Sequence, residues 1–82
     1  MDRMDQRTAA LQQAALEQLR IERAASNLSY MEIARRVEVS EKTVRRYFAG
    51  ERDIPMPTLL QMLEAMGVSV QAFWERSVAR IA

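Results

Sequence analysis

The amino-acid sequence predicts an all-α fold in which five helices form one compact domain. Only two of the 82 residues are glycine and two are proline, while residue types with high helix propensity, such as Ala, Leu, Met, Glu, Gln and Arg, are common. Apolar residues recur at helical spacing along several segments, and residues that favour helix ends separate these segments. The hydrophobic fraction of 49% and the charged fraction of 28% are typical of a globular chain. We therefore expect a single domain over residues 1–82.

The first predicted helix covers residues 3–26, a stretch rich in Ala and Gln that contains no helix breaker. Leu16 and Leu19 give this helix an apolar side that can pack on a core. Its first part, residues 1–15, is expected to be a helical extension of the domain. Asn27 is expected to end the helix.

Two short helices joined by a tight turn are predicted within residues 29–49. Ser29, followed by Glu32 three residues later, has the spacing of a capping box at the start of the first helix. Ser40 is expected to cap the second helix, which covers residues 41–48. Small or apolar side chains occupy the inward positions of both helices and of the turn: Ile33, Ala34, Val37, Val39, Val44 and Tyr47. This pattern is what a helix-turn-helix requires, because its two helices cross steeply at short range.

Two further helices are predicted after Gly50, which should end the second short helix in a left-handed conformation. Pro57 suits the first turn of the next helix, and Gly67 is expected to close that helix. Its predicted inner residues are Leu59, Leu60, Met62, Leu63 and Met66. Ser69 is expected to cap the last helix, which covers residues 69–82.

The region from about residue 19 to residue 74 resembles the Cro/C1-type (XRE) helix-turn-helix family, the lambda-repressor-like DNA-binding domains. The resemblance rests on Leu28-Ser29, Ile33-Ala34, Val39-Ser40, Thr43-Val44, Gly50-Glu51-Arg52 with Pro55, and Ala65-Met66-Gly67-Val68. It implies a compact helical domain in which residues 41–48 form a recognition helix that enters the major groove of double-stranded DNA. It also implies a small transcriptional regulator of phage or bacterial type, either a repressor or a Cro-like protein. Two positions depart from the family pattern: Glu38 replaces the usual glycine, and Tyr30 replaces a frequent glutamine.

Charged side chains cover the predicted outer face of the recognition helix. The predicted base contacts are Glu41, Lys42, Thr43, Arg45 and Arg46. Lys and Arg suit the O6 and N7 acceptors of guanine, and Glu41 suits the amino group of cytosine. The predicted phosphate contacts are Tyr30, Ser40 and Arg52. On an arbitrary helix such charges would more often form a solvated face, but within a helix-turn-helix pattern they favour a contact with DNA. The net charge of only +1 predicts a local contact rather than a diffuse one.

The composition excludes several other classes of function. The chain has no cysteine and no histidine, which rules out disulfides, thiolate nucleophiles, zinc sites built from these residues and histidine acid–base catalysis. No carboxylate pair is placed for catalysis, so we expect no enzymatic activity, no cofactor and no metal. The short chain leaves no room for a separate sensing domain, so no small-molecule ligand is expected.

The start of the sequence carries charges, at Asp2, Arg3, Asp5 and Arg7, where a signal peptide would be apolar. No apolar run is long enough to span a bilayer. We therefore expect a cytoplasmic protein without a membrane contact.

The last predicted helix carries an apolar stripe that extends past the needs of the core. Its outer members are Trp74, Val78 and Ile81. They could form the contact of a homodimer bound to operator half-sites, or they could pack against the first helix. Other functions also fit this fold: a recombination or excision accessory factor, the antitoxin of a toxin–antitoxin pair or, in another class, a helical protein-interaction module that does not bind DNA.

Overall fold

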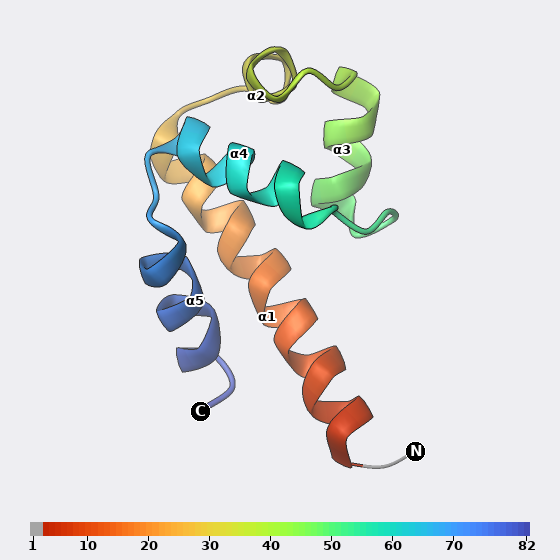
Figure 1. The fold of residues 1–82 in the computed structure, drawn as a ribbon, viewed down its shortest axis with the longest axis vertical. Coiled ribbons are helices and arrows are strands. Elements are labelled where there is room, and N and C mark those ends of the chain that lie inside the picture. The colour runs from red at the N-terminus through yellow and green to blue at the C-terminus, as the bar shows by residue number, and fades with distance from the viewer. Residues whose placement is uncertain (1–2) are drawn as a thin grey trace.

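The computed structural model describes residues 3–82, with side chains from Asp5 onward. It contains five helices: α1 (Arg3–Ser26), α2 (Tyr30–Val37), α3 (Glu41–Ala49), α4 (Met56–Met66) and α5 (Val70–Ala79). These residues contain no strand, so the predicted all-α fold of five helices is confirmed. The N-terminal half of α1 extends away from the other helices, α5 runs beside α1, and α2, α3 and α4 gather around the other end of α1 (Figure 1).

All five helices contribute side chains to one hydrophobic core. Its buried members are Leu19, Ile33, Ala34, Val37, Val44, Tyr47, Phe48, Met62, Leu63, Met66 and Phe73. The inward positions predicted for the two short helices are among them. The prediction was wrong for Leu60, which is 41% exposed, while Leu59 packs at the edge of the core. Only one side of a helix can face the core, and the start of α4 has more apolar residues than that side can hold. Leu60 is therefore left on the surface.

Serine side chains start three of the helices. Ser29, Ser40 and Ser69 each accept a hydrogen bond from the backbone N–H three residues later, which satisfies a donor that the helix itself cannot pair. At Ser29 the capping box is complete, because Glu32 accepts in return from the Ser29 backbone N–H at 3.3 Å. The three predicted caps are confirmed. Pro55 holds the corresponding position before α4 without a side-chain hydrogen bond.

Left-handed residues follow four of the helices, and two of them, Asn27 after α1 with φ 61° and Glu38 after α2, lack the freedom of glycine. Gly50 and Gly67 close α3 and α4 with φ of 78° and 74°, as predicted. Glu38 closes α2 with φ 58° and ψ 41°, and its backbone N–H donates to the Ala34 carbonyl. The tight turn therefore keeps the left-handed geometry that glycine favours, although a side chain is present.

A polar network joins α1 to α5. The Glu22 carboxylate is 5% exposed and accepts hydrogen bonds from Arg76 at 2.7 Å and from Gln18 at 2.8 Å. Arg80 donates to the Gln18 side-chain oxygen at 2.9 Å and pairs with Glu17 at 3.6 Å. Burial alone would raise the pKa of Glu22, but the hydrogen bonds from Arg76 and Gln18 and the charge of Arg76 outweigh it, so the pKa is lowered from 4.5. Glu22 is therefore ionised at neutral pH.

Candidate nucleic-acid interface

The helix-turn-helix is built from the sizes of its inward side chains. Ala34 is 4% exposed and Val44 is fully buried, so the two helices pack with a small side chain on α2 and a branched one on α3. Val39 in the turn packs against the same core. Because Val44 and Tyr47 are buried on one side of α3, the opposite side of this helix is presented to solvent.

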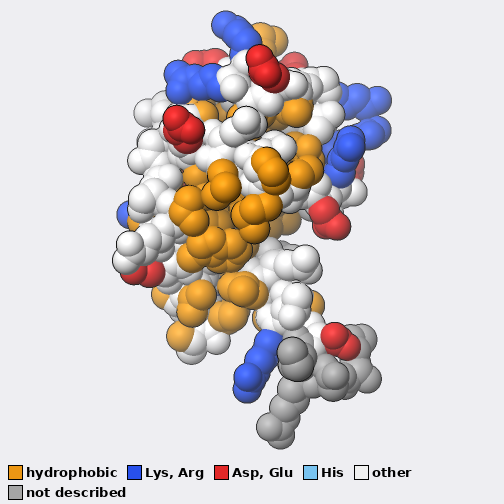
Figure 2. Space-filling view, in the orientation of Figure 1, with side chains coloured by type: hydrophobic (Ala, Val, Ile, Leu, Met, Phe, Trp, Pro, Cys, Tyr) orange, Lys and Arg blue, Asp and Glu red, His pale blue; other side chains and the backbone are white. Residues whose placement is uncertain are grey.

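The predicted base-contacting residues lie on this outer side of α3. Lys42, Arg45 and Arg46 are exposed, and Glu41 and Thr43 are half-buried. Arg45 pairs with Glu41 at 3.1 Å, whereas Lys42 and Arg46 have no ion pair within residues 5–82. Lys and Arg side chains, interspersed with Asp and Glu, lie at the end of the molecule formed by α2 and α3 (Figure 2). The outer side of α3 therefore offers two unpaired cations and one paired arginine.

Tyr30 opens α2 and lies beside two arginines. The Arg23 guanidinium carbon is 4.4 Å from the centroid of the Tyr30 ring, and that of Arg45 is 4.9 Å away. The ring also packs against Phe48 with a centroid separation of 5.3 Å. The two distances from arginine to the ring are within the range of cation–π contacts. The structure thus joins Tyr30, Glu41 and Arg45 into one cluster at the junction of α2 and α3.

Ser40 and Thr43 form a second pair of predicted site residues. The Ser40 hydroxyl accepts from the Thr43 backbone N–H at 3.1 Å, and the two side-chain hydroxyls lie 2.8 Å apart. The Ser40 oxygen is thus committed to the start of α3. Thr43 bonds back to the same residue, which leaves its methyl group as the part suited to an apolar contact with thymine.

Arg52 lies apart from these clusters, exposed in the loop after α3. It lines a groove of about 530 Å³ between this loop, the first half of α1, the start of α4 and α5. Apolar side chains make up much of the groove wall: Leu11, Ala15, Leu16, Ile54, Met56, Leu59, Phe73 and Trp74. Figure 2, drawn in the orientation of Figure 1, shows a broad hydrophobic region on the face that α1, α4 and α5 form.

The three residues predicted for a dimer face differ in exposure. Trp74 packs against the core and meets the Phe73 ring at 5.4 Å in an edge-on arrangement. Val78 and Ile81, in contrast, are 48% and 45% exposed. Trp74 therefore belongs partly to the domain interior, and the other two remain available on the surface.

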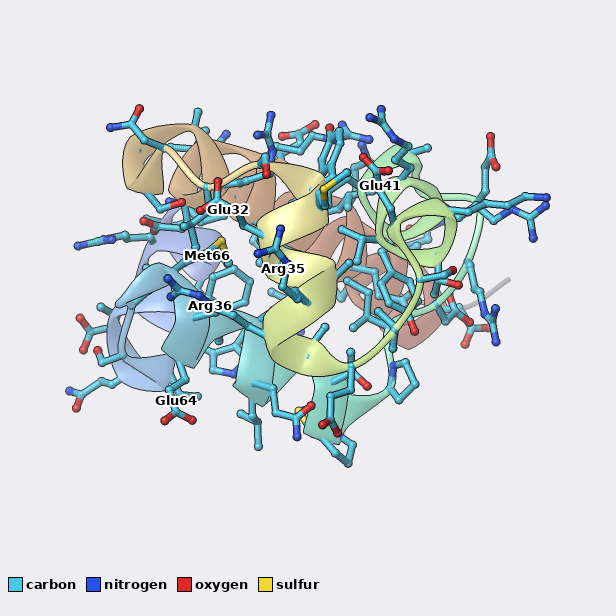
Figure 3. The ribbon with its side chains drawn as sticks, turned by 90° about the horizontal axis from the view of Figure 1, so that it is seen from above. Glu32, Arg35, Arg36, Glu41, Glu64 and Met66 are labelled. Carbon is cyan, nitrogen blue, oxygen red and sulfur yellow. The ribbon has the colours of Figure 1, made fainter. Side chains whose placement is uncertain are left out.

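Two arginines hold the helix-turn-helix to the other helices. The Arg20 Nε in α1 donates to the Phe48 carbonyl at 2.8 Å, and an Arg36 Nη in α2 donates to the Ala65 carbonyl at 3.1 Å. Seen from above, Arg36 lies over the end of α4 near Met66, while Arg35 stands on the outer side of α2 (Figure 3). No sequence pattern indicates these two hydrogen bonds, because the accepting backbone carbonyls lie 28 and 29 residues away from the arginines.

Comparison with known proteins identifies the domain type. A family model described as a helix-turn-helix domain matches residues 14–73. The chain belongs to this helix-turn-helix family. Membership indicates DNA-binding transcription regulation as the general class of function.

The fold of this helix-turn-helix protein is also similar to a solved structure. The clp gene regulator ClgR from C. glutamicum matches with a TM-score of 0.74 at 24% sequence identity, over 88% of this chain and 92% of that chain. A likeness at this identity shows the fold. A search of curated proteins found no match. Within the described residues, no helix has both the length and the apolar character needed to cross a membrane.

Proposed function

We propose that this protein binds double-stranded DNA sequence-specifically and acts as a small transcriptional regulator of the XRE, Cro/C1-like type. The observation that carries the proposal is the exposure of Lys42, Arg45 and Arg46 on the outer side of α3, within a helix-turn-helix domain. In such domains this helix lies in the major groove. Cations are the side chains most suited to guanine edges there.

The proposed contacts fall into two groups. Lys42, Arg45 and Arg46 read bases, and Glu41 and Thr43 complete the reading surface. Tyr30 and Arg52 contact phosphates through their side chains, and Ser40 does so through the N-terminus of α3 that it caps. Such contacts fix the register of the domain on the duplex without reading sequence. Of these three, Arg52 carries a charge and contributes to the salt dependence of binding.

The protein is further proposed to bind as a homodimer on repeated operator half-sites. A single domain with few phosphate contacts binds weakly at physiological salt, and a second copy supplies the missing affinity. Val78 on α5 and Ile81 just beyond its end are exposed apolar side chains, and Trp74 lines the apolar groove. These three residues form the proposed two-fold contact. A DNA-binding regulator of bacterial type acts in the cytoplasm, which is the location that the sequence predicts.

The test is selection of bound duplexes from a random pool, followed by titrations at several salt concentrations. We expect one preferred sequence, with half-sites about one helical turn apart for a dimer. Lys42→Ala and Arg45→Ala should each abolish the preference at one base pair while the circular dichroism of the helices is unchanged. Arg7→Ala serves as the control, because it removes an exposed cation from the extended half of α1.

Two results would contradict the proposal. Selectivity that survives both substitutions would overturn the assignment of α3 as the recognition helix. A wild-type protein without salt-dependent duplex binding would instead favour the helical protein-interaction module.

A further inference from the structure

Arg45 is held in place before any DNA arrives. Its Nη2 lies 3.1 Å from the Glu41 carboxylate, and its guanidinium carbon lies 4.9 Å from the centroid of the Tyr30 ring. The Arg45 side chain is 60% exposed, and an arginine so exposed ordinarily samples many rotamers. The ion pair with Glu41 joins positions i and i+4 at the surface, where such pairs are weak. Tyr30 is therefore the second constraint that Arg45 needs to keep one orientation.

The Tyr30 ring is itself fixed from two other helices. Phe48 in α3 is 3% exposed and packs against it at 5.3 Å. Arg23 in α1 lies 4.4 Å from the ring centroid, and its Nη1 donates to the Leu28 carbonyl at 3.1 Å, in the loop just before α2. A ring held in this way gives Arg45 a rigid surface to rest on.

We propose that Tyr30 is a specificity-determining residue, which acts by positioning Arg45 toward a guanine edge. This inference rests on the proposed function. Reading guanine through O6 and N7 requires the planar guanidinium to present two donors in one defined orientation. Glu41 occupies only one of the five guanidinium donors. Fixing the side chain beforehand lowers the entropy lost on binding, and it disfavours orientations that would suit other bases.

Three substitutions at Tyr30 separate this role from a phosphate contact by its hydroxyl. Tyr30→Phe keeps the ring and removes the hydroxyl. Tyr30→Gln keeps a hydrogen-bond donor and removes the ring, and Tyr30→Leu removes both. Each variant is titrated with four duplexes that differ only at the base pair where Arg45→Ala loses its preference.

The expected result follows the ring. Tyr30→Phe should keep the wild-type discrimination among the four duplexes, and Tyr30→Gln and Tyr30→Leu should each lower it about two- to fivefold, the size of an exposed cation–π contact. Tyr30→Gln should cause no further loss in the Arg45→Ala background, because the two residues act as one unit. In the free protein, the side-chain protons of Arg45 should show the ring-current NMR shift of an aromatic neighbour in wild type and Tyr30→Phe, and lose it in Tyr30→Gln.

Several outcomes would overturn the positioning role. Equal discrimination in all three variants means that the ring sets no preference. A uniform loss of affinity in Tyr30→Phe and Tyr30→Leu, with unchanged discrimination in all three variants, would leave Tyr30 with the proposed phosphate contact alone. Thermal unfolding shows whether each variant folds. If Tyr30→Gln or Tyr30→Leu does not fold, the NMR spectra of wild type and Tyr30→Phe serve as the test. Absence of the ring-current shift from the Arg45 protons in both proteins would then contradict the proposal. If the wild-type protein binds no duplex, it is the proposed function that fails, so the two failures can be distinguished.

Discussion

The α2–α3 corner and the α1–α5 layer are held together by different kinds of interaction. In the corner, buried apolar side chains such as Ile33, Val37 and Val44 fill the space between two helices that are neighbours in the sequence. The α1–α5 layer also has apolar contacts, at Leu19 and Phe73, but it adds a polar network in which the Glu22 carboxylate is buried and hydrogen-bonded.

This difference has a physical consequence for how each region tolerates change. The corner depends on shape, because a lost methyl group leaves a cavity that its short helices cannot close. The α1–α5 layer depends on charge, because a buried carboxylate is stable only while its partners remain in place. The corner should therefore respond to side-chain volume at any pH, and the layer should respond to pH.

The largest effect is expected from a change of volume in the corner. Ile33 is fully buried, and Ile33→Ala should lower the free energy of unfolding by about 2–5 kcal/mol. A domain of this size has little stability to spare, so the melting temperature should fall by roughly 10 °C or more. Thermal unfolding followed by circular dichroism measures the change. Met31→Ala is the matched control on the same helix, because Met31 is 52% exposed; similar losses in both variants would show that shape does not control the corner.

An intermediate effect is expected from neutralising the buried carboxylate of the α1–α5 layer. At neutral pH, Glu22→Gln should lower the free energy of unfolding by about 1–2 kcal/mol, since it weakens hydrogen bonds to a charged group. The pKa of Glu22 is lower in the folded protein than its ordinary value of 4.5, so the unfolded chain takes up the proton first as the pH falls. The stability that the ionised carboxylate provides is thus complete above about pH 4.5 and is lost as the pH falls through the folded value.

Denaturant titrations at several pH values measure this dependence. The wild type and Glu22→Gln should differ at neutral pH and converge in acid. Glu17→Gln provides the control, because Glu17 is 46% exposed and pairs with Arg80 at 3.6 Å, an arrangement worth under about 1 kcal/mol. A constant difference between wild type and Glu22→Gln at every pH would contradict a role for the charge.

The same contrast explains which features could be read from the sequence. The caps at Ser29, Ser40 and Ser69 and the buried positions of the corner follow from spacings of three or four residues, which a linear sequence displays directly. Glu22 and Arg76 are 54 residues apart, and no local pattern distinguishes that pair from two solvated charges. The sequence predicts Tyr30 and Arg45 as DNA contacts but does not show that they contact each other, because that contact depends on how α2 lies against α3. The predicted DNA contacts themselves remain predictions.

The smallest effect is expected at Glu38, where the corner departs from the pattern that its own geometry favours. Its φ of 58° is a conformation that glycine adopts without steric cost. Glycine also loses more backbone entropy on folding, which offsets part of the gain. Glu38→Gly should therefore raise the free energy of unfolding by less than about 1 kcal/mol, with a small rise in melting temperature. Glu38→Ala is the matched control, because it removes the carboxylate and keeps the strain. If alanine stabilises the domain as much as glycine, the cost of Glu38 arises from its charge and not from the left-handed backbone.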